Sequence, residues 1–159
     1  MALITYLVED NATLLTNLIE TLQEITDVKV VGYSATQAEA DRWLSLHDGQ
    51  WHLAIVDLFL KEGSGLGVLT GCRHRESYQK VVLLTNYATA EIRKRALLLG
   101  ADAVFDKSSE IDDLLAYCVK QTEAEAHKKA TVQEAERVAT AKSKLDPVPT
   151  GELRTIAPQ

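Results

Sequence analysis

Cysteine and proline are scarce in this sequence. There are two cysteines, Cys72 and Cys118, and both lie inside helical patterns. We therefore predict two small buried thiols in a reducing compartment, rather than a disulfide that stabilises a secreted fold. The three prolines all lie beyond residue 146, so none interrupts the elements expected before it.

Long apolar runs and an excess of positive charge are also missing. No run approaches the roughly 20 apolar residues of a membrane span, and the N-terminus lacks the basic flank of a secretory signal. The net charge is −6 at pH 7, and residues 1–122 carry all of it. An acidic body does not suit a phosphate backbone. We therefore predict a cytoplasmic protein that binds neither membranes nor nucleic acid directly.

The first 120 residues alternate strand and helix patterns five times, which predicts an α/β fold with a parallel sheet. We expect strands at residues 3–8, 28–33, 53–59, 80–84 and 103–105. We expect helices at residues 11–25, 36–46, 66–76 and 89–99, and a fifth helix capped by Ser108 or Ser109. Thr36 and Glu39 match a capping box, and Gly100 is placed to end the fourth helix.

Apolar residues at helical spacing predict which helix faces are buried. The first helix should bury a stripe that ends at Ile25, and the second should bury Trp43, Leu44 and Leu46. Arg93, Lys94 and Arg95 form a basic stretch on the fourth helix, which we interpret as a solvated face.

The pattern changes after residue 122. Residues 123–144 are rich in Ala, Glu and Lys but carry no wide apolar stripe. They either continue the fifth helix or form a partly helical tail, and we expect disorder in the last dozen residues. The helix stops here are Pro147, Pro149, Gly151 and Pro158. We predict one domain at residues 1–122 and an extension at 123–159, with no separate output domain.

Polar residues follow four of the predicted strands at their C-terminal ends. They are Glu9 and Asp10, Asp57, Thr85 and Lys107. In an open parallel sheet these ends converge on one crevice where ligands bind. We therefore expect three carboxylates, a hydroxyl and a lysine from distant parts of the chain to meet.

Three acids so close together repel one another unless a cation lies between them. Asp57 stands in an otherwise apolar strand, where a carboxylate is costly unless it lies at the open end. Oxygen-only ligands of this kind suit Mg²⁺, and Lys107 could neutralise a bound phosphoryl oxygen. The set predicts a divalent-metal and phosphoryl site.

These strings together resemble the receiver domain of two-component response regulators. The resemblance covers residues 3 to about 121. It rests on Leu-Val-Glu-Asp-Asn, Ile-Val-Asp-Leu-Phe-Leu, Gly-Ser-Gly at 63–65, Leu-Leu-Thr-Asn-Tyr, Gly-Ala-Asp at 100–102 and Phe-Asp-Lys-Ser. It implies a flavodoxin-like (βα)5 fold, in which a parallel five-stranded sheet has the strand order 2-1-3-4-5.

The resemblance also implies roles for the clustered residues. Asp57 would accept a phosphoryl group from a histidine kinase or a histidine phosphotransfer protein. Asp10, Asp57 and the main-chain carbonyl of Phe59 would hold Mg²⁺, with Glu9 reaching it directly or through water. Lys107 would contact the phosphoryl oxygens, and Thr85 would reorient to report the phosphate. Output would pass to a downstream protein, with a possible dimer through the fourth helix and fifth strand or through the C-terminal helix.

The sequence differs from the family pattern at three positions. Val104 stands where a Tyr or Phe is usual, and Phe105 should face the other side of its strand. The sequence therefore leaves open whether an aromatic side chain changes rotamer together with Thr85. Asn86 replaces a very small residue, and Ser108 replaces a proline that often follows a cis bond.

A further hypothesis concerns how long the phosphate persists. Phe59 and Tyr87 flank the crevice and are bulky. They could exclude attacking water and so make an aspartyl-phosphate long-lived.

Other functions remain as alternatives. A Mg²⁺-dependent phosphohydrolase with an aspartyl nucleophile would need a second acid two residues later, where Phe59 stands. A flavin carrier would need a phosphate-binding loop where Glu9 and Asp10 stand. The chain could also be a receiver fragment of a longer transcriptional regulator.

Overall fold

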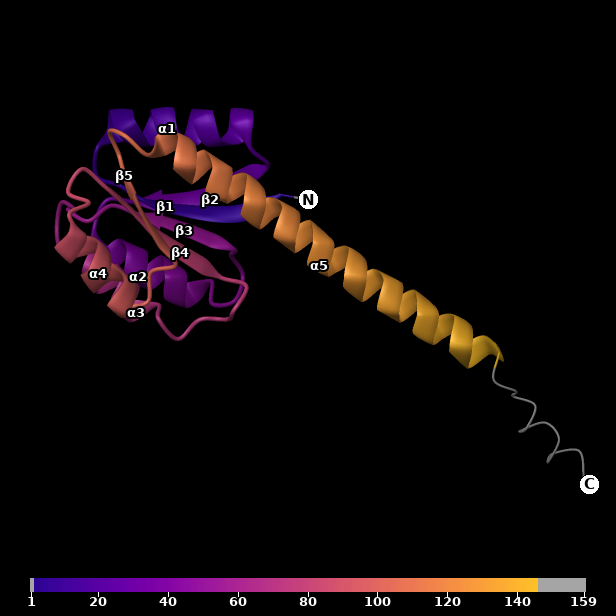
Figure 1. The fold of residues 1–159 in the computed structure, drawn as a ribbon. Coiled ribbons are helices and arrows are strands. Elements are labelled where there is room, and N and C mark those ends of the chain that lie inside the picture. The colour runs from indigo at the N-terminus through magenta and orange to yellow at the C-terminus, as the bar shows by residue number, and fades with distance from the viewer. Residues whose placement is uncertain (1, 146–159) are drawn as a thin grey trace, which may run out of the picture. The chain divides into compact units, whose positions relative to one another are not determined.

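The computed structural model describes residues 2–145, in which five strands alternate with five helices (Figure 1). The strands are β1 (Leu3–Val8), β2 (Val28–Ser34), β3 (Leu53–Val56), β4 (Lys80–Thr85) and β5 (Ala103–Asp106). The helices are α1 (Ala12–Ile25), α2 (Gln37–Leu46), α3 (Gly65–Gly71), α4 (Ala90–Leu98) and α5 (Ile111–Leu145).

All strand pairs are parallel, and the sheet has the order β2-β1-β3-β4-β5. This confirms the predicted fold class and strand order. All residues of the central strand β3 are buried, because helices cover both faces of the sheet. α1 and the first turns of α5 cover one face, and α2, α3 and α4 cover the other (Figure 1).

Helix starts follow from local sequence. Side-chain oxygens of Asn11, Thr36, Ser64 and Thr89 accept hydrogen bonds from the first turns of α1 to α4, so each satisfies an otherwise free N–H. Gly100 has φ +107° just after α4, a conformation that favours glycine, which confirms its predicted role in ending that helix.

Two predicted element ends are wrong. β3 ends at Val56 rather than at residue 59, because the chain turns back after Asp57 and pairs Phe59 with Ser64. α3 ends at Gly71 rather than at residue 76. The segment after it is held by Arg75, whose guanidinium donates to the carbonyls of Cys72 and Gln79.

Two residues predicted to be buried are exposed. Ile25 lies at the last position of α1 and is 60% exposed, and Leu46 ends α2 and is 67% exposed. Each is the last residue of its helix, so the apolar spacing continues to a position where none of the other described elements covers the side chain.

The fifth helix begins later than predicted. Ser108 and Ser109 do not cap it but donate to the carboxylate of Asp106 within a turn, and α5 starts at Ile111. Of the two alternatives for the extension, a continued fifth helix and a partly helical tail, the structure shows the continued helix, which ends at Leu145. The expected disorder and the helix stops at Pro147, Pro149, Gly151 and Pro158 lie outside the described residues.

The chain divides into two units, residues 1–123 and 124–159. In the second unit, the side chains of residues 126–141 are all exposed, which agrees with the missing apolar stripe. The predicted boundary at residue 122 between a functional domain and an extension stays a prediction.

The two cysteines are free, with Cys118 buried and Cys72 half-buried. Burial raises the pKa of Cys72 to about 11 and that of Cys118 to about 12, so both thiols stay protonated at neutral pH. Within residues 2–145, no helix is long and apolar enough to cross a membrane.

The close contact between Gly65 and the main chain of Asp57 predicts that a larger residue at position 65 destabilises the fold. A Cβ added at Gly65 would overlap the main-chain oxygen of Asp57, and backbone cannot move aside as a side chain can. We expect Gly65→Ala to lower the free energy of unfolding by about 1–3 kcal/mol, measured by urea denaturation. In the matched variant Gly71→Ala, the new Cβ meets only the side chain of Asp41 at 3.0 Å. Equal losses in the two variants would contradict this.

Candidate functional site

The C-terminal ends of β1, β3, β4 and β5 border one cleft of about 260 Å³. Each of these strands is followed by polar residues, so the parallel sheet brings together groups that are far apart in the sequence. The residues that line the cleft are Glu9, Asp10, Asn11, Leu14, Asp57, Phe59, Thr85, Asn86, Tyr87 and Lys107. All the predicted site residues are among them.

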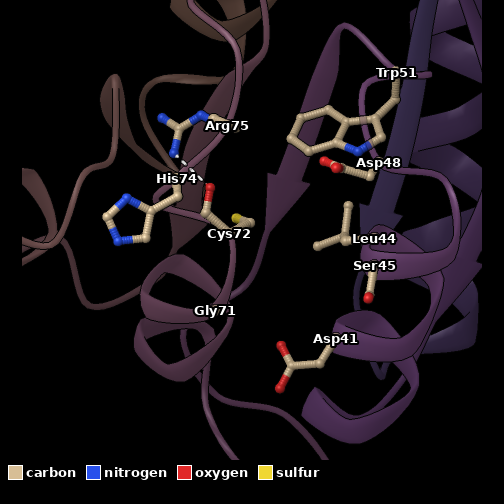
Figure 2. A pocket seen from close by; sticks show the side chains of 9 residues that line it. All are labelled: Asp41, Leu44, Ser45, Asp48, Trp51, Gly71, Cys72, His74 and Arg75. Carbon is tan, nitrogen blue, oxygen red and sulfur yellow. Dashed lines mark hydrogen bonds between the residues drawn. The ribbon is translucent and has the colours of Figure 1, made fainter.

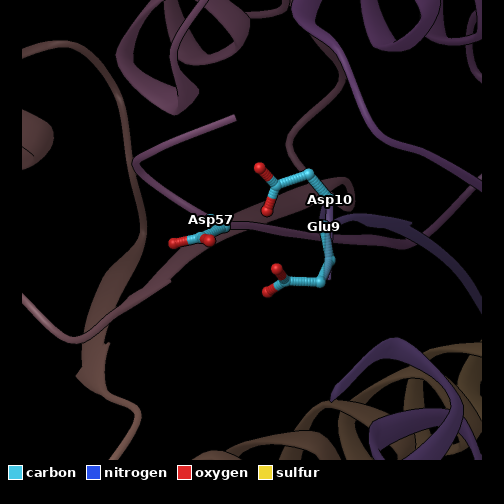
Figure 3. Close-up of side chains that lie close together, drawn as sticks. All are labelled: Glu9, Asp10 and Asp57. Atoms are coloured by element: carbon cyan, nitrogen blue, oxygen red, sulfur yellow. The ribbon is translucent and has the colours of Figure 1, made fainter. Parts of the chain in front are cut away.

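Three carboxylates meet in this cleft. Glu9, Asp10 and Asp57 each offer an oxygen within 4.8 Å of the others. Figure 3 shows the three carboxylates turned to the same side. Glu9 and Asp57 are 5% and 7% exposed, whereas Asp10 is exposed to solvent. The cluster therefore has two buried acids and one that remains accessible.

Lys107 is the cation that faces the two buried acids. Its Nζ lies 2.7 Å from Glu9 Oε1 and 2.9 Å from Asp57 Oδ2, and only 10% of its side chain is exposed. Burial alone would lower the pKa of Lys107, but its hydrogen bonds to Glu9 and Asp57 raise that pKa above the ordinary value. The lysine is therefore held in its charged form.

Lys107 does not fully compensate the acids. Burial raises the pKa of Glu9 above its ordinary value, even though the hydrogen bonds from Lys107 and from the Asn11 N–H lower it. The charge of Asp57 also raises the pKa of Glu9. The negative charge of the three acids is therefore only partly neutralised by Lys107.

The donor set fits a magnesium ion. Two oxygens bound to the same Mg²⁺ lie about 3–4 Å apart, given bonds of about 2.0–2.1 Å. Oxygens within 4.8 Å of one another can reach such an arrangement by small side-chain rotations. Asp10, which is exposed, can bind an ion that keeps several of its waters. The residues present therefore suit this metal.

Thr85 lies at the end of β4 and is fully buried. Its Oγ1 accepts a hydrogen bond of 3.1 Å from the Tyr87 N–H, and its main-chain oxygen accepts one of 3.0 Å from the Lys107 N–H. The residue is thus connected both to the segment that follows β4 and to the turn that carries Lys107.

Aromatic rings border the cleft. Phe59 and Tyr87 make an edge-to-face contact, with ring centroids 4.8 Å apart and planes at 86°. Each is 57% exposed, so the pair lies at the mouth of the cleft rather than in the core. The role of the Phe59 main-chain carbonyl as a metal ligand stays a prediction.

Val104 and Phe105 lie on opposite faces of β5, as expected from strand geometry. Val104 packs in the core cluster that includes Val56 and Val68, whereas Phe105 packs in the cluster that includes Leu114 and contacts Tyr117. No aromatic side chain from residues 103–106 therefore lies on the Val104 face. The peptide bonds of the described residues are trans, including the one after Lys107.

Sequence reasoning missed the role of Arg93, which was interpreted as part of a solvated face. Its guanidinium pairs with Glu110 at 2.6 Å and also bonds the carbonyls of Ala88 and Val104. These partners are separated from Arg93 by 5 to 17 residues without a regular spacing. No local pattern in the sequence could have indicated them.

A second cavity of about 240 Å³ lies between α2 and α3, away from the strand ends (Figure 2). Its Arg75 is committed to Asp102 at 2.7 Å. Among the described residues, the Trp51 N–H and one oxygen of Asp41 border this cavity without a hydrogen-bond partner. Water can enter a polar cavity of this size and bond both atoms. None of these residues lines the cleft that holds the acids.

Comparison with known proteins gives one family match. The family described as response regulator receiver domain matches residues 5–118. The chain is 34% identical over 68 residues to the acid tolerance regulatory protein ActR of Rhizobium meliloti (strain 1021), covering 43% of this chain and 35% of ActR. It is 26% identical over 124 residues to the photosynthetic apparatus regulatory protein RegA of Rhodobacter capsulatus, covering 74% of this chain and 62% of RegA. The chain thus spans less than two thirds of the length of these relatives.

Solved structures share the fold. A DNA-binding response regulator of the LuxR family from Staphylococcus aureus matches with a TM-score of 0.67 and 18% identity, over 75% of this chain and 98% of that one. The signal receiver domain of the putative response regulator NarL from Mycobacterium tuberculosis matches with a TM-score of 0.65 and 23% identity, over 75% and 97%.

The raised pKa of Glu9 predicts that the stability of the metal-free protein falls as pH rises above 4.5, and that Glu9→Gln lacks this fall. Between the ordinary pKa of 4.5 and the higher pKa of the folded protein, the unfolded chain loses the Glu9 proton while the folded protein still holds it. The stability of the wild type therefore falls as pH rises through this window, and glutamine avoids that loss.

Urea unfolding with a chelator at pH 4 to 8 measures this effect. The stability of Glu9→Gln relative to the wild type should rise with pH above 4.5 and be independent of this group below about pH 4. Glu24→Gln, an exposed position on α1, is the matched control. A stability of Glu9→Gln relative to the wild type that stays constant or falls from pH 4 to pH 8 would overturn the argument.

Proposed function

Because this chain belongs to the response regulator receiver domain family, we propose that it is a phosphoacceptor switch of a two-component phosphorelay. A histidine kinase or a histidine phosphotransfer protein would phosphorylate it on Asp57. The observation that carries the proposal is the position of Lys107, whose Nζ contacts Asp57 and Glu9 beside the carboxylate of Asp10. This arrangement combines a nucleophile, a fixed cation and a metal-binding set in one cleft.

The geometry suits transfer of a phosphoryl group to Asp57. Oδ2 of Asp57 is held by Lys107, and no other hydrogen bond to this carboxylate occurs among the described residues. An oxygen of Asp57 would form a bond to phosphorus as the bond from phosphorus to the donor imidazole nitrogen breaks. The imidazole leaves with the bonding electron pair and takes a proton. Such transfers depend on in-line positioning and on charge neutralisation.

Lys107 and a metal ion would share the neutralisation. Asp10, Asp57 and the main-chain carbonyl of Phe59 would hold Mg²⁺, with Glu9 reaching it directly or through water. The ion, when bound, would supply charge stabilisation for the phosphoryl oxygens. Lys107 supplies a second positive charge from the C-terminal end of β5, since it is already fixed beside Asp57.

Thr85 would report the phosphate. Its hydroxyl oxygen now accepts from the Tyr87 N–H. Donation of the Thr85 hydroxyl to a phosphoryl oxygen would reorient this side chain and alter the segment that follows β4.

Output would pass through contacts with another protein. Leu97 and Leu98 on α4 are 52% and 78% exposed, which leaves apolar surface beside β5 for a downstream partner or for a second copy of the chain. The helical residues 124–145 offer another surface for dimer formation. We also propose a cytoplasmic location, where the phosphodonor would act.

Turnover of phosphate esters is a less suitable function. An aspartyl phosphohydrolase needs a second acid to protonate the leaving group. Two residues beyond Asp57 stands Phe59, whose ring packs on Tyr87 at the mouth of the cleft. Membership of a longer transcriptional regulator is the other alternative, and the partial coverage of ActR and RegA favours keeping it.

Incubation with acetyl phosphate and Mg²⁺ tests the proposed function. We expect a stoichiometric mass increase of one phosphoryl group in the wild type, none in Asp57→Asn, and the normal increase in the exposed control Asp112→Asn. Lys107→Gln should slow phosphorylation by about 100-fold or more, since a fixed donor beside developing charge is worth about 3–4 kcal/mol. Phosphorylation of Asp57→Asn, or steady release of product without a phosphorylated protein, would refute the proposal.

The aromatic pair predicts the lifetime of the phosphate. Replacing Phe59 and Tyr87 together by Ala opens the mouth of the cleft to water. We expect hydrolysis of the aspartyl-phosphate to accelerate by about tenfold, which corresponds to about 1.4 kcal/mol in the barrier. Loss of label from isolated phosphoprotein measures this rate, with Tyr33→Ala, an exposed aromatic on β2, as control. An unchanged lifetime would remove the aromatic pair from this role.

A further inference from the structure

Arg93 of α4 bonds three separate segments at once. Its Nε donates to the Ala88 carbonyl at 3.0 Å, and one terminal nitrogen donates to the Val104 carbonyl at 3.2 Å. The other terminal nitrogen lies 2.6 Å from Glu110 Oε1. The guanidinium therefore joins the segment after β4, the middle of β5 and the residue that precedes α5.

Glu110 connects this contact to the turn that carries Lys107. The same oxygen that pairs with Arg93 accepts a 2.8 Å hydrogen bond from the Asp106 N–H. The Glu110 N–H in turn donates to the Asp106 carbonyl at 2.9 Å. Residues 106–110 thus form a closed turn, and Lys107 lies inside it.

The bond from Arg93 to the Ala88 carbonyl reaches the segment next to Thr85. Thr85 holds the Tyr87 N–H through its hydroxyl, and Ala88 follows directly. Thr85 also accepts the Lys107 N–H on its main-chain oxygen. Two routes therefore connect Thr85 with the Lys107 turn, one through this direct bond and one through Arg93.

We propose that Arg93 is a positioning residue for the phosphoacceptor site, which holds the turn of Lys107 against the segment after Thr85 and transmits a reorientation of Thr85 to the start of α5. This inference rests on the proposed function. If the Thr85 hydroxyl turns toward a phosphoryl oxygen, it releases the Tyr87 N–H. Ala88 then shifts, and Arg93 carries the shift to Val104 and Glu110.

An arginine is required for this role. A planar guanidinium presents several donors in a fixed fork, so it can bond two carbonyls and a carboxylate together. A lysine keeps the charge but places a single ammonium, which cannot reproduce the three directions. Comparison of the two side chains therefore separates geometry from charge.

The test uses the full chain labelled with ¹⁵N and titrated with Mg²⁺ and beryllium fluoride, a mimic of the phosphoryl group. In the wild type we expect amide shifts at residues 86–89 and also at Val104, Glu110 and Ile111. In Arg93→Gln the mimic should still bind and shift residues 86–89, while the shifts at Val104, Glu110 and Ile111 fall by at least half. Arg93→Lys should resemble Arg93→Gln.

Arg95→Gln is the matched control, because Arg95 lies on the same helix, carries the same charge and is exposed. It should keep the full response. If Arg93→Gln does not fold, Glu110→Gln provides the test, since it removes the charge of the ion pair while its amide oxygen can still accept from the Asp106 N–H, and it should reduce the shifts at Val104 and Ile111.

The outcomes are distinguishable. A wild type that does not bind the mimic would refute the proposed function, and the role of Arg93 with it. A wild type that binds and responds, with a full response at Val104, Glu110 and Ile111 in Arg93→Gln, would overturn the role of Arg93 alone. A full response in Glu110→Gln, where that variant serves as the test, would do the same.

Discussion

The bond between one lysine and two buried carboxylates is the interaction on which the site depends. Removing carboxylates from water costs several kcal/mol each unless they are paired. Lys107 meets that cost for Glu9 and Asp57 only in part, since burial still raises the pKa of Glu9. A further cation beside these acids would therefore stabilise their charged form in the folded protein. The three carboxylates therefore suit a divalent cation, the ligand class that acidic clusters of this kind typically hold.

The parallel sheet makes the pairing of Lys107 with the two acids possible, and hydrogen bonds of Thr85 connect the Lys107 turn to the segment after β4. Glu9 and Lys107 are 98 residues apart in the chain, yet strands that run in the same direction present their ends at one edge. Thr85 ends β4, the strand between β3 and β5, and it accepts hydrogen bonds from the Tyr87 N–H and the Lys107 N–H. These bonds join the buried end of β4 to the segment that follows it and to the turn that carries Lys107. Under the proposed function, a chemical change at Asp57 would therefore act first on these two segments.

The alternating strands and helices and the polar residues at the strand ends could be predicted from the sequence. Alternating apolar runs predict five strands, the resemblance to receiver domains implies their order, and Asp57 is conspicuous because a charge interrupts a buried run. Prediction failed where long-range contacts decide the outcome. Arg75 holds the chain after Gly71 and so ends α3 early, and Leu46 follows its helical spacing but is exposed at the last position of α2. The partners of Arg93 are spaced irregularly, so only the folded chain brings them together.

The close approach of Gly65 to Asp57 has a consequence for protein engineering. The chain between them is tied at both ends, since the Asp57 N–H bonds the Val8 carbonyl and the Gly65 N–H bonds that of Leu58. A grafted loop would have to preserve both bonds and the close contact of Gly65 with the Asp57 main chain. Chimaeras made from related proteins should therefore exchange residues 57–71 as one cassette, with crossover points outside it.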